Sequence, residues 1–152
     1  MMDEPEYISE VRVILDQHVD QARAQLAKLS GLLPAAAKSM EIVIFIDQDG
    51  EGFLDVRVSL EGPDLYVLNK AIEEAAVLFE TKVVDGEMVP PLPLVDPDED
   101  ELPVQDILTD CAADWLRGVW EGMDHRGFRI PVVIVSHDGY GSRTPILLCP
   151  SA

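Results

Sequence analysis

The chain has few of the residue types that build metal and disulfide sites. Its 152 residues include only two cysteines and three histidines. Cys111 and Cys149 form neither a CxxC motif nor a cluster with histidines, and this spacing is not typical of a disulfide framework or a structural zinc site. From the sequence we therefore expect a protein without a cofactor.

Long apolar runs are also missing. No apolar stretch approaches the roughly 20 residues that cross a bilayer. The first residues, Met1-Met2-Asp3-Glu4-Pro5-Glu6, are acidic, whereas a secretory signal begins with a basic segment and an apolar run. We expect a soluble, cytoplasmic protein that forms a single domain over residues 1–152, because 47% apolar content is enough to bury a core.

Basic residues are scarce relative to acidic ones. There are 11 lysines and arginines against 29 aspartates and glutamates, which gives a net charge of −18. This charge repels phosphate backbones and anionic lipids, so we expect no binding to nucleic acid or membranes and favour a basic protein partner. The alternative is that the acidity serves only to keep the protein soluble.

Hydrophobic periodicity predicts the elements of the first half. Apolar residues recur every three or four positions over residues 6–33, which predicts one amphipathic helix. Residues 41–46 are apolar on both faces, as in a central strand, and residues 54–60 alternate between apolar and polar. These two strands are predicted to form a hairpin around Asp49-Gly50-Glu51-Gly52.

The middle of the chain predicts a helix and an acidic loop. Gly62-Pro63-Asp64 opens a second helix, which we expect to continue to about Glu80. Residues 82–89 fit a small hairpin around Asp85-Gly86. Residues 90–103 are rich in proline and acids, and they predict an extended, exposed loop.

The last third predicts a helix and a second hairpin. The helix covers about residues 104–123, and the hairpin joins residues 130–136 to residues 144–149 around Asp138-Gly139-Tyr140-Gly141. The predicted fold is α+β, with an antiparallel sheet built from two β-hairpins and three helices packed mainly on one face.

The turn from Asp47 to Asp55 resembles the start of an EF-hand calcium loop. It has oxygen-bearing side chains at the first, third and fifth positions and glycine at the sixth. The twelfth position, where a bidentate carboxylate is required, is Val58, and the flanking segments are predicted strands where the motif has helices. Calcium binding at this turn is one alternative function.

The helix at residues 104–123 carries an unusual charge pattern. Asp106, Asp110 and Asp114 are four residues apart, opposite the apolar stripe that contains Cys111. Like charges at this spacing destabilise a helix by a few tenths of a kcal/mol per pair, so helix stability does not account for the pattern. At about 100° per residue, Trp120 is predicted at the border of this acidic face, where an aromatic beside acids is typical of a binding hot spot.

This acidic helix and the loop before it suggest a function. In general makeup the chain resembles the immunity proteins that bacteria make to neutralise partner toxins, and the resemblance covers the composition and the 96–121 segment. It implies an acidic protein-binding or inhibitor module in which the aspartates steer a basic partner and Trp120 anchors it. A further alternative is an enzyme that uses scattered acids and His137, although no catalytic motif is evident. The predicted partner-binding residues are Asp98, Glu99, Asp100, Glu101, Asp106, Asp110, Asp114 and Trp120.

Overall fold

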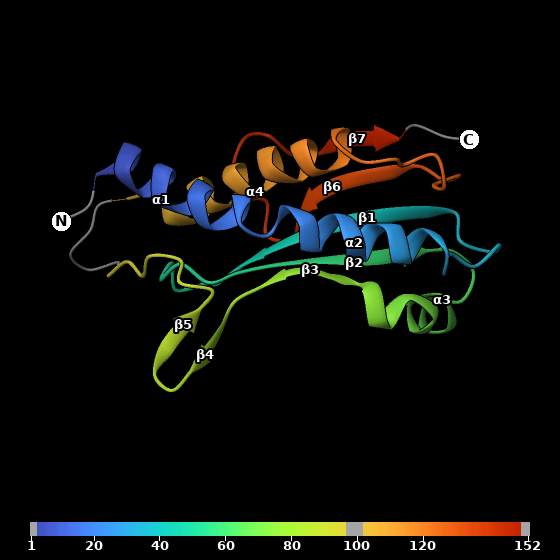
Figure 1. Ribbon diagram of the computed structural model, residues 1–152, viewed down its shortest axis with the longest axis horizontal. Helices are drawn as coiled ribbons and strands as arrows, with labels where there is room; N and C mark the ends of the chain where they lie inside the picture. The colour runs from blue at the N-terminus through green and yellow to red at the C-terminus, as the bar shows by residue number, and fades with distance from the viewer. Residues whose placement is uncertain (1–2, 97–101, 150–152) are drawn as a thin grey trace.

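A computed structural model describes residues 3–96 and 102–149 and has an α+β fold with a five-stranded sheet, a two-stranded sheet and four α-helices (Figure 1). Asp3 caps the first helix, because its Oδ1 accepts a hydrogen bond from the Glu6 N–H at 2.9 Å. The elements are α1 (Glu4–Asp16), α2 (Val19–Ser30), β1 (Ser39–Ile46), β2 (Leu54–Glu61), α3 (Leu65–Ile72), η1 (Glu73–Ala75), β3 (Val77–Glu80), β4 (Lys82–Val84), β5 (Glu87–Val89), α4 (Val104–Glu121), β6 (Val132–Ser136) and β7 (Ile146–Cys149).

The single helix predicted over residues 6–33 is wrong, since the chain breaks into α1 and α2 at Gln17 and His18. The N–H groups of these two residues donate to Ile14 and Leu15, three residues back, which tightens and ends the first helix. His18 Nδ1 also lies 2.8 Å from the Ile14 carbonyl oxygen. Because both helices bury the same face, the apolar periodicity continues across the break and does not reveal it.

The two predicted hairpins are present, but the sheet is mixed, so the prediction of an antiparallel sheet is wrong. Its strand order is β3-β2-β1-β6-β7. Strands β1 and β2 are antiparallel, as are β6 and β7, whereas β1 and β6 pair in parallel from Met40 opposite Val132 to Ile44 opposite Ser136. A hairpin follows from local turn residues, but the pairing between two hairpins depends on segments far apart in sequence. As a result, the loops after β1 and β6 leave the sheet at the same edge.

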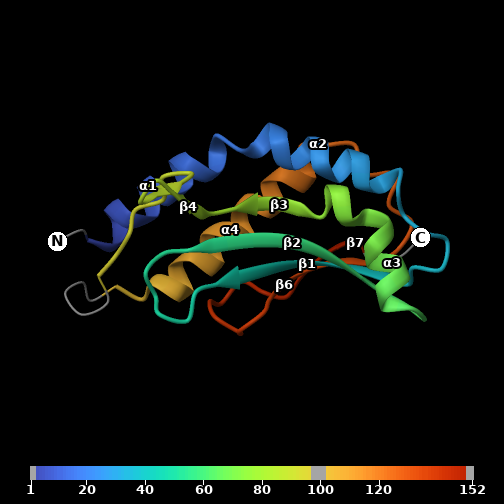
Figure 2. The ribbon, with the colours of Figure 1, turned by 90° about the horizontal axis from the view of Figure 1, so that it is seen from below.

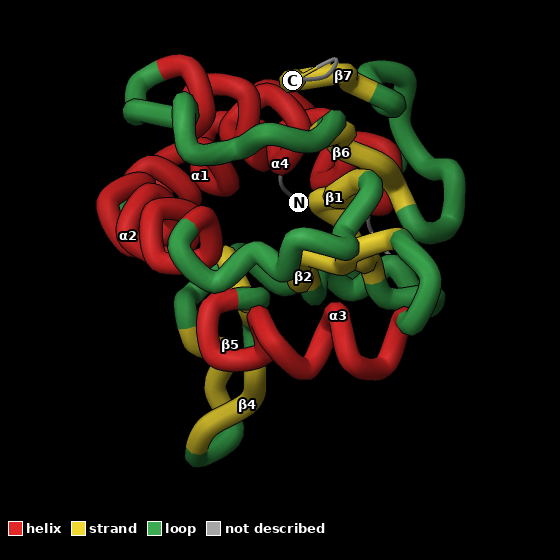
Figure 3. The backbone as a smooth tube through the Cα atoms, turned by 90° about the vertical axis from the view of Figure 1, so that its right-hand side faces the viewer, coloured by secondary structure: helices red, strands yellow, loops and turns green. Residues whose placement is uncertain are grey.

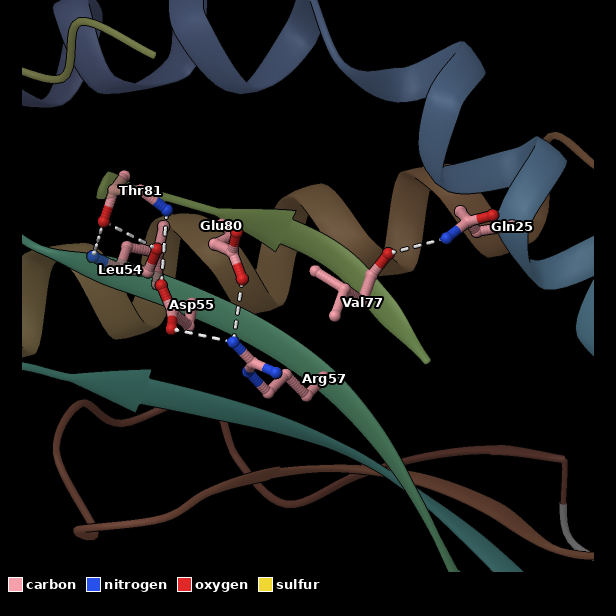
Figure 4. Close-up of polar contacts among 7 residues, drawn as sticks. All are labelled: Gln25, Leu54, Asp55, Arg57, Val77, Glu80 and Thr81. Carbon is pink, nitrogen blue, oxygen red and sulfur yellow. Dashed lines mark hydrogen bonds and ion pairs between the residues drawn. The ribbon is translucent and has the colours of Figure 1, made fainter. Parts of the chain in front are cut away.

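The second helix is shorter than predicted and is followed by a strand. Helix α3 ends at Ile72, and residues 77–80 form the edge strand β3, which pairs with β2. Asn69 bonds to both the N–H and the carbonyl of Leu60, so its amide replaces a strand partner where β3 does not reach. At the other end of β3, Thr81 Oγ1 bonds to the N–H and carbonyl of Leu54 (Figure 4).

In the part of the chain that the structure describes, helices cover only one face of the sheet. Helix α4 packs on β1, α1 packs on α4, and α2 packs on β3 and α4; Figures 2 and 3 show these helices on the same side. Helix α3 lies beside β2 instead. The predicted hairpin at residues 82–89 is present as β4 and β5, and it projects from the body (Figure 1). The strand side chains buried under the helices include Met40, Ile42, Ile44, Ile46, Leu54, Val56, Val58, Leu60, Phe79, Val132 and Ile134.

The acidic loop predicted at residues 90–103 is only partly exposed where the structure describes it. Leu92 and Val95 are buried, and the Val95 N–H donates to the Glu51 carbonyl at 2.8 Å. This segment therefore packs on the turn between β1 and β2.

Among residues 3–96 and 102–149, no helix combines the length and the apolar content needed to span a bilayer.

Candidate functional site

Two Asp-Gly loops lie at the carboxyl edge of β1 and β6. We call residues 47–53 the first loop and residues 137–145 the second loop. Both loops pack on the N-terminal half of α4 through glycines with positive φ: Gly50 (+71°) and Gly141 (+79°). A Cβ at Gly50 would lie 2.9 Å from Gln105 Nε2, and one at Gly141 would lie 2.5 Å from Asp110 Oδ1. Only glycine permits both the backbone conformation and the close approach.

The three predicted aspartates of α4 all face the second loop. Asp106 Oδ1 accepts from the Gly141 N–H at 2.8 Å. Asp110 accepts three hydrogen bonds, from the Ser142 N–H at 2.8 Å, the Ser142 hydroxyl at 3.2 Å and the Arg143 N–H at 3.0 Å. Asp114 Oδ1 pairs with Arg143 Nε at 3.2 Å. The repulsion between like charges on α4 is therefore offset by hydrogen bonds to this loop.

The first loop is held mainly by its own aspartate. The Asp47 carboxylate accepts hydrogen bonds from the N–H groups of Glu51 (2.9 Å), Gly52 (3.2 Å) and Phe53 (2.9 Å). These donors surround the carboxylate that would be the first ligand of a calcium loop. Within residues 3–96 and 102–149, no three His, Cys, Asp or Glu side chains are grouped to hold a metal ion.

A groove runs between α1 and α4 beside the second loop, and we call it the α4 groove. It encloses 180 Å³. Four carboxylates and two guanidinium groups line this groove. One of the two guanidinium groups, that of Arg143, is paired with Asp114. The residues that line it are Glu4, Ile8, Arg12, Pro103, Asp106, Ile107, Asp110, Cys111, Asp114 and Arg143.

Cys111 lies in the α4 groove but is 4% exposed. Burial raises the pKa of its thiol, and this effect outweighs the opposing influence of the Arg12 guanidinium, which bonds to the thiol. A thiol with a raised pKa stays protonated at neutral pH and is a weak nucleophile. The residue therefore packs as a small apolar side chain.

Trp120 does not lie beside the acidic face, so this part of the predicted site is wrong. Its side chain is 3% exposed and stacks on His125, with ring centroids 4.7 Å apart. Phe128 packs against it at 5.0 Å. The chain that follows α4 folds back over the indole, which the angular position along the helix does not reveal. A buried tryptophan cannot anchor a partner at this surface.

The other predicted binding residues have different outcomes. Asp98, Glu99, Asp100 and Glu101 lie outside the described residues, whereas Asp106, Asp110 and Asp114 do form one surface. Sequence reasoning missed Arg143, which contacts α4 from 29 residues away and follows an ordinary turn. His137, named for the enzymatic alternative, packs against Phe45 with the rings tilted and their centroids 4.8 Å apart, and it bonds to Asp138 at 3.2 Å.

Tyr7 of α1 is a buried group near the first loop. It is 0% exposed, and its hydroxyl has no hydrogen-bond partner among the described residues. Burial is the main cause that raises the pKa of this phenol, and the nearby Cys111 and Asp47 raise it further. The side chain therefore remains neutral and contributes through packing.

Comparison with known proteins gives one match. A family model described as "Family of unknown function (DUF6389)" matches residues 2–150. No curated protein and no solved structure matches the chain.

Proposed function

The chain belongs to this family, DUF6389, and we propose that it is a non-catalytic binding module that takes a basic protein partner in the α4 groove. The observation that carries the proposal is the set of carboxylates along the groove, Glu4, Asp106, Asp110 and Asp114, which outnumber its two arginines. Such a surface attracts lysine and arginine side chains and repels acidic competitors.

The groove is also held in a defined shape. Asp110 and Asp114 are positioned by their bonds to Ser142 and Arg143, so they lose little conformational freedom when a partner arrives. Preorganised polar groups bind more tightly than mobile ones, because less ordering is needed on association. Asp106 is exposed and extends this negative surface to the rim.

The whole-molecule charge supports the same partner. A net charge of −18 speeds the approach of a basic protein and hinders association with acidic ones. Neutralisation of a basic toxin, as in the immunity proteins that the chain resembles in makeup, is the specific form of binding that we propose. In that role the carboxylates of the groove would cover cationic residues of the toxin.

Capture of partners from native lysate, with the full chain as bait, tests this proposal first. A basic protein should be recovered, and its affinity should fall as salt rises from about 50 to about 200 mM, because salt screens exposed charges. The double variant Glu4→Gln/Asp106→Asn removes two exposed rim charges without touching Asp110 or Asp114. We expect it to weaken binding about tenfold.

The matched control is Asp85→Asn/Glu87→Gln on the projecting β4–β5 hairpin. It removes the same charge from two exposed residues away from the groove. If both double variants weaken the captured protein equally, only net charge matters and the α4 groove is not the site. If neither variant changes affinity, the proposal is wrong.

A further inference from the structure

The face of the sheet opposite the helices, which we call the open face, carries an aliphatic stripe. Val43 of β1 lies opposite Val135 of β6, and Val133 lies opposite Leu147 of β7. Leu147 is 60% exposed, and the three valines are partly exposed. A sheet face in contact with water usually carries polar residues at these alternating positions. A contiguous apolar stripe there is typical of an interaction surface.

Among the residues that the structure describes, the charged side chains of the open face are mostly acidic. The strand register places Glu41, Glu61, Asp55 and Glu80 on it with one basic residue, Arg57. Arg57 bonds to Glu80 at 2.8 Å and lies 3.5 Å from Asp55 (Figure 4). Four carboxylates against one guanidinium leave this half of the face negative, so it complements a cationic ligand.

Two of these carboxylates are close enough to influence each other. Partial burial raises the pKa of Glu41, and a hydrogen bond to Glu61 and that residue's charge raise it further. A cation placed beside the pair would relieve their mutual repulsion. This half of the face therefore gains stability from a basic ligand.

A cavity of 280 Å³ lies at one end of the open face. Phe45 and Asp55, which are directly opposite each other in the sheet, line it together with Phe53. Aromatic rings beside a carboxylate are the surroundings that a lysine or arginine head group prefers. The cavity thus offers a place for one long cationic side chain.

We propose that the open face is a second docking surface, which binds an amphipathic basic segment of a protein partner. The apolar side of the segment covers Val43, Val133, Val135 and Leu147, while its lysines or arginines face the carboxylates and the cavity at Phe45. This surface lies on the other side of the sheet from the α4 groove and does not depend on it.

A second copy of this chain is a poorer occupant. Two-fold pairing of the open faces places each acidic half close to another acidic surface, and each copy carries a net charge of −18. An amphipathic basic segment covers the same apolar stripe without this repulsion.

The test uses two synthetic peptides of about 18 residues, long enough for five helical turns. One peptide has a leucine stripe and a lysine face, and the other keeps every lysine but has glutamine in place of leucine. Titration into ¹⁵N-labelled full-length protein should shift the amide resonances of Val43, Val133, Val135 and Leu147 with the leucine peptide. Its Kd should be about tenfold lower than that of the glutamine peptide.

Leu147→Ser should raise the Kd for the leucine peptide about fivefold and leave the glutamine peptide unaffected. The matched control is Val13→Ser, a change at an aliphatic residue of α1 with similar exposure, 55% against 60%. This control should bind both peptides as the unmodified protein does.

Four results would overturn the inference. The first is equal Kd values for the two peptides, and the second is an unchanged Kd for Leu147→Ser. The third is a dimer in analytical ultracentrifugation that Leu147→Ser converts to monomers, since a second copy would then occupy the face. Shifts confined to Ile8 and Ile107 would place this peptide in the α4 groove, which contradicts the second surface while supporting the first.

Discussion

The two Asp-Gly loops lie side by side on α4, yet they are held by different means. The first loop folds around its own Asp47, which accepts three N–H groups from within the same turn. Within the described residues, no aspartate of the second loop accepts its backbone N–H groups, and the loop instead bonds to Asp106, Asp110 and Asp114 of α4. One loop is therefore a local structure, whereas the conformation of the other depends on the helix beneath it.

This difference explains why the same dipeptide has two roles. Aspartate before glycine favours a tight turn in both places. In the first loop the stabilising acid, Asp47, belongs to the turn itself, so the turn depends little on contacts with the rest of the protein. In the second loop the stabilising acids are on a distant helix, so the turn and the carboxylates of the α4 groove are organised together.

The largest expected effect comes from Gly52→Ala in the first loop. Gly52 has φ +119°, and an added Cβ would lie 2.9 Å from the Pro93 carbonyl oxygen. Backbone strain and this collision together should lower the free energy of unfolding by about 4 kcal/mol, measured by urea denaturation. The counterpart in the second loop is Gly139→Ala, where φ is +78° and an added Cβ would meet nothing within 4 Å. Only backbone strain remains there, so the loss should be about 1–2 kcal/mol, and a loss above about 3 kcal/mol would contradict the view that this loop tip is open.

Asp47→Ala is next, because it removes the internal anchor of the first loop. Three hydrogen bonds to a carboxylate are lost at a partly buried position, so we expect a loss of about 3 kcal/mol in the free energy of unfolding. The neighbouring exposed Asp49→Ala serves as the control and should change stability by less than about 0.5 kcal/mol. Equal effects of the two substitutions would show that charge, rather than the hydrogen bonds of Asp47, holds the loop.

Asp110→Ala tests the external anchor of the second loop. It removes three hydrogen bonds to Ser142 and Arg143, and we expect a loss of about 2 kcal/mol. The amide of Asp110→Asn can still accept one or two of these bonds, so its loss should be about 1 kcal/mol. Backbone order parameters of residues 141–143 should fall with Asp110→Ala while those of residues 51–53 stay unchanged. A simultaneous loss of order in both loops would mean that they are not independent.

The smallest effect is expected for Asp106→Asn. This exposed residue accepts one hydrogen bond, from the Gly141 N–H, and an amide oxygen can replace the carboxylate. The free energy of unfolding should change by about 0.5 kcal/mol or less in urea denaturation. A change above about 1.5 kcal/mol would show that Asp106 stabilises the second loop about as much as Asp110 does. Asp106 would then be a structural residue rather than only an exposed charge for binding.

Part of the site could be predicted from the sequence. Spacing correctly places Asp106, Asp110 and Asp114 on one face of α4, but it wrongly places Cys111 on the opposite face, since the thiol lines the same groove. The unfavourable spacing of like charges indicates a role beyond helix stability, and in the structure an interaction with the second loop offsets it. The nature of that interaction could not be predicted, because the compensating groups are 29 to 35 residues away in sequence. The same limit applies to Trp120, which is covered by Phe128 of the following segment.

The sequence by itself determined the local features of this protein. Turn residues specify both hairpins, periodicity specifies α4, and composition specifies the excess of acids. Only the tertiary structure decided that β1 and β6 pair in parallel, that residues 77–80 form a strand, and that the aspartates of α4 hold the second loop. The physical reason is that turns and helical faces depend on neighbours within a few residues, whereas strand partners and side-chain acceptors are selected when distant segments pack around one core.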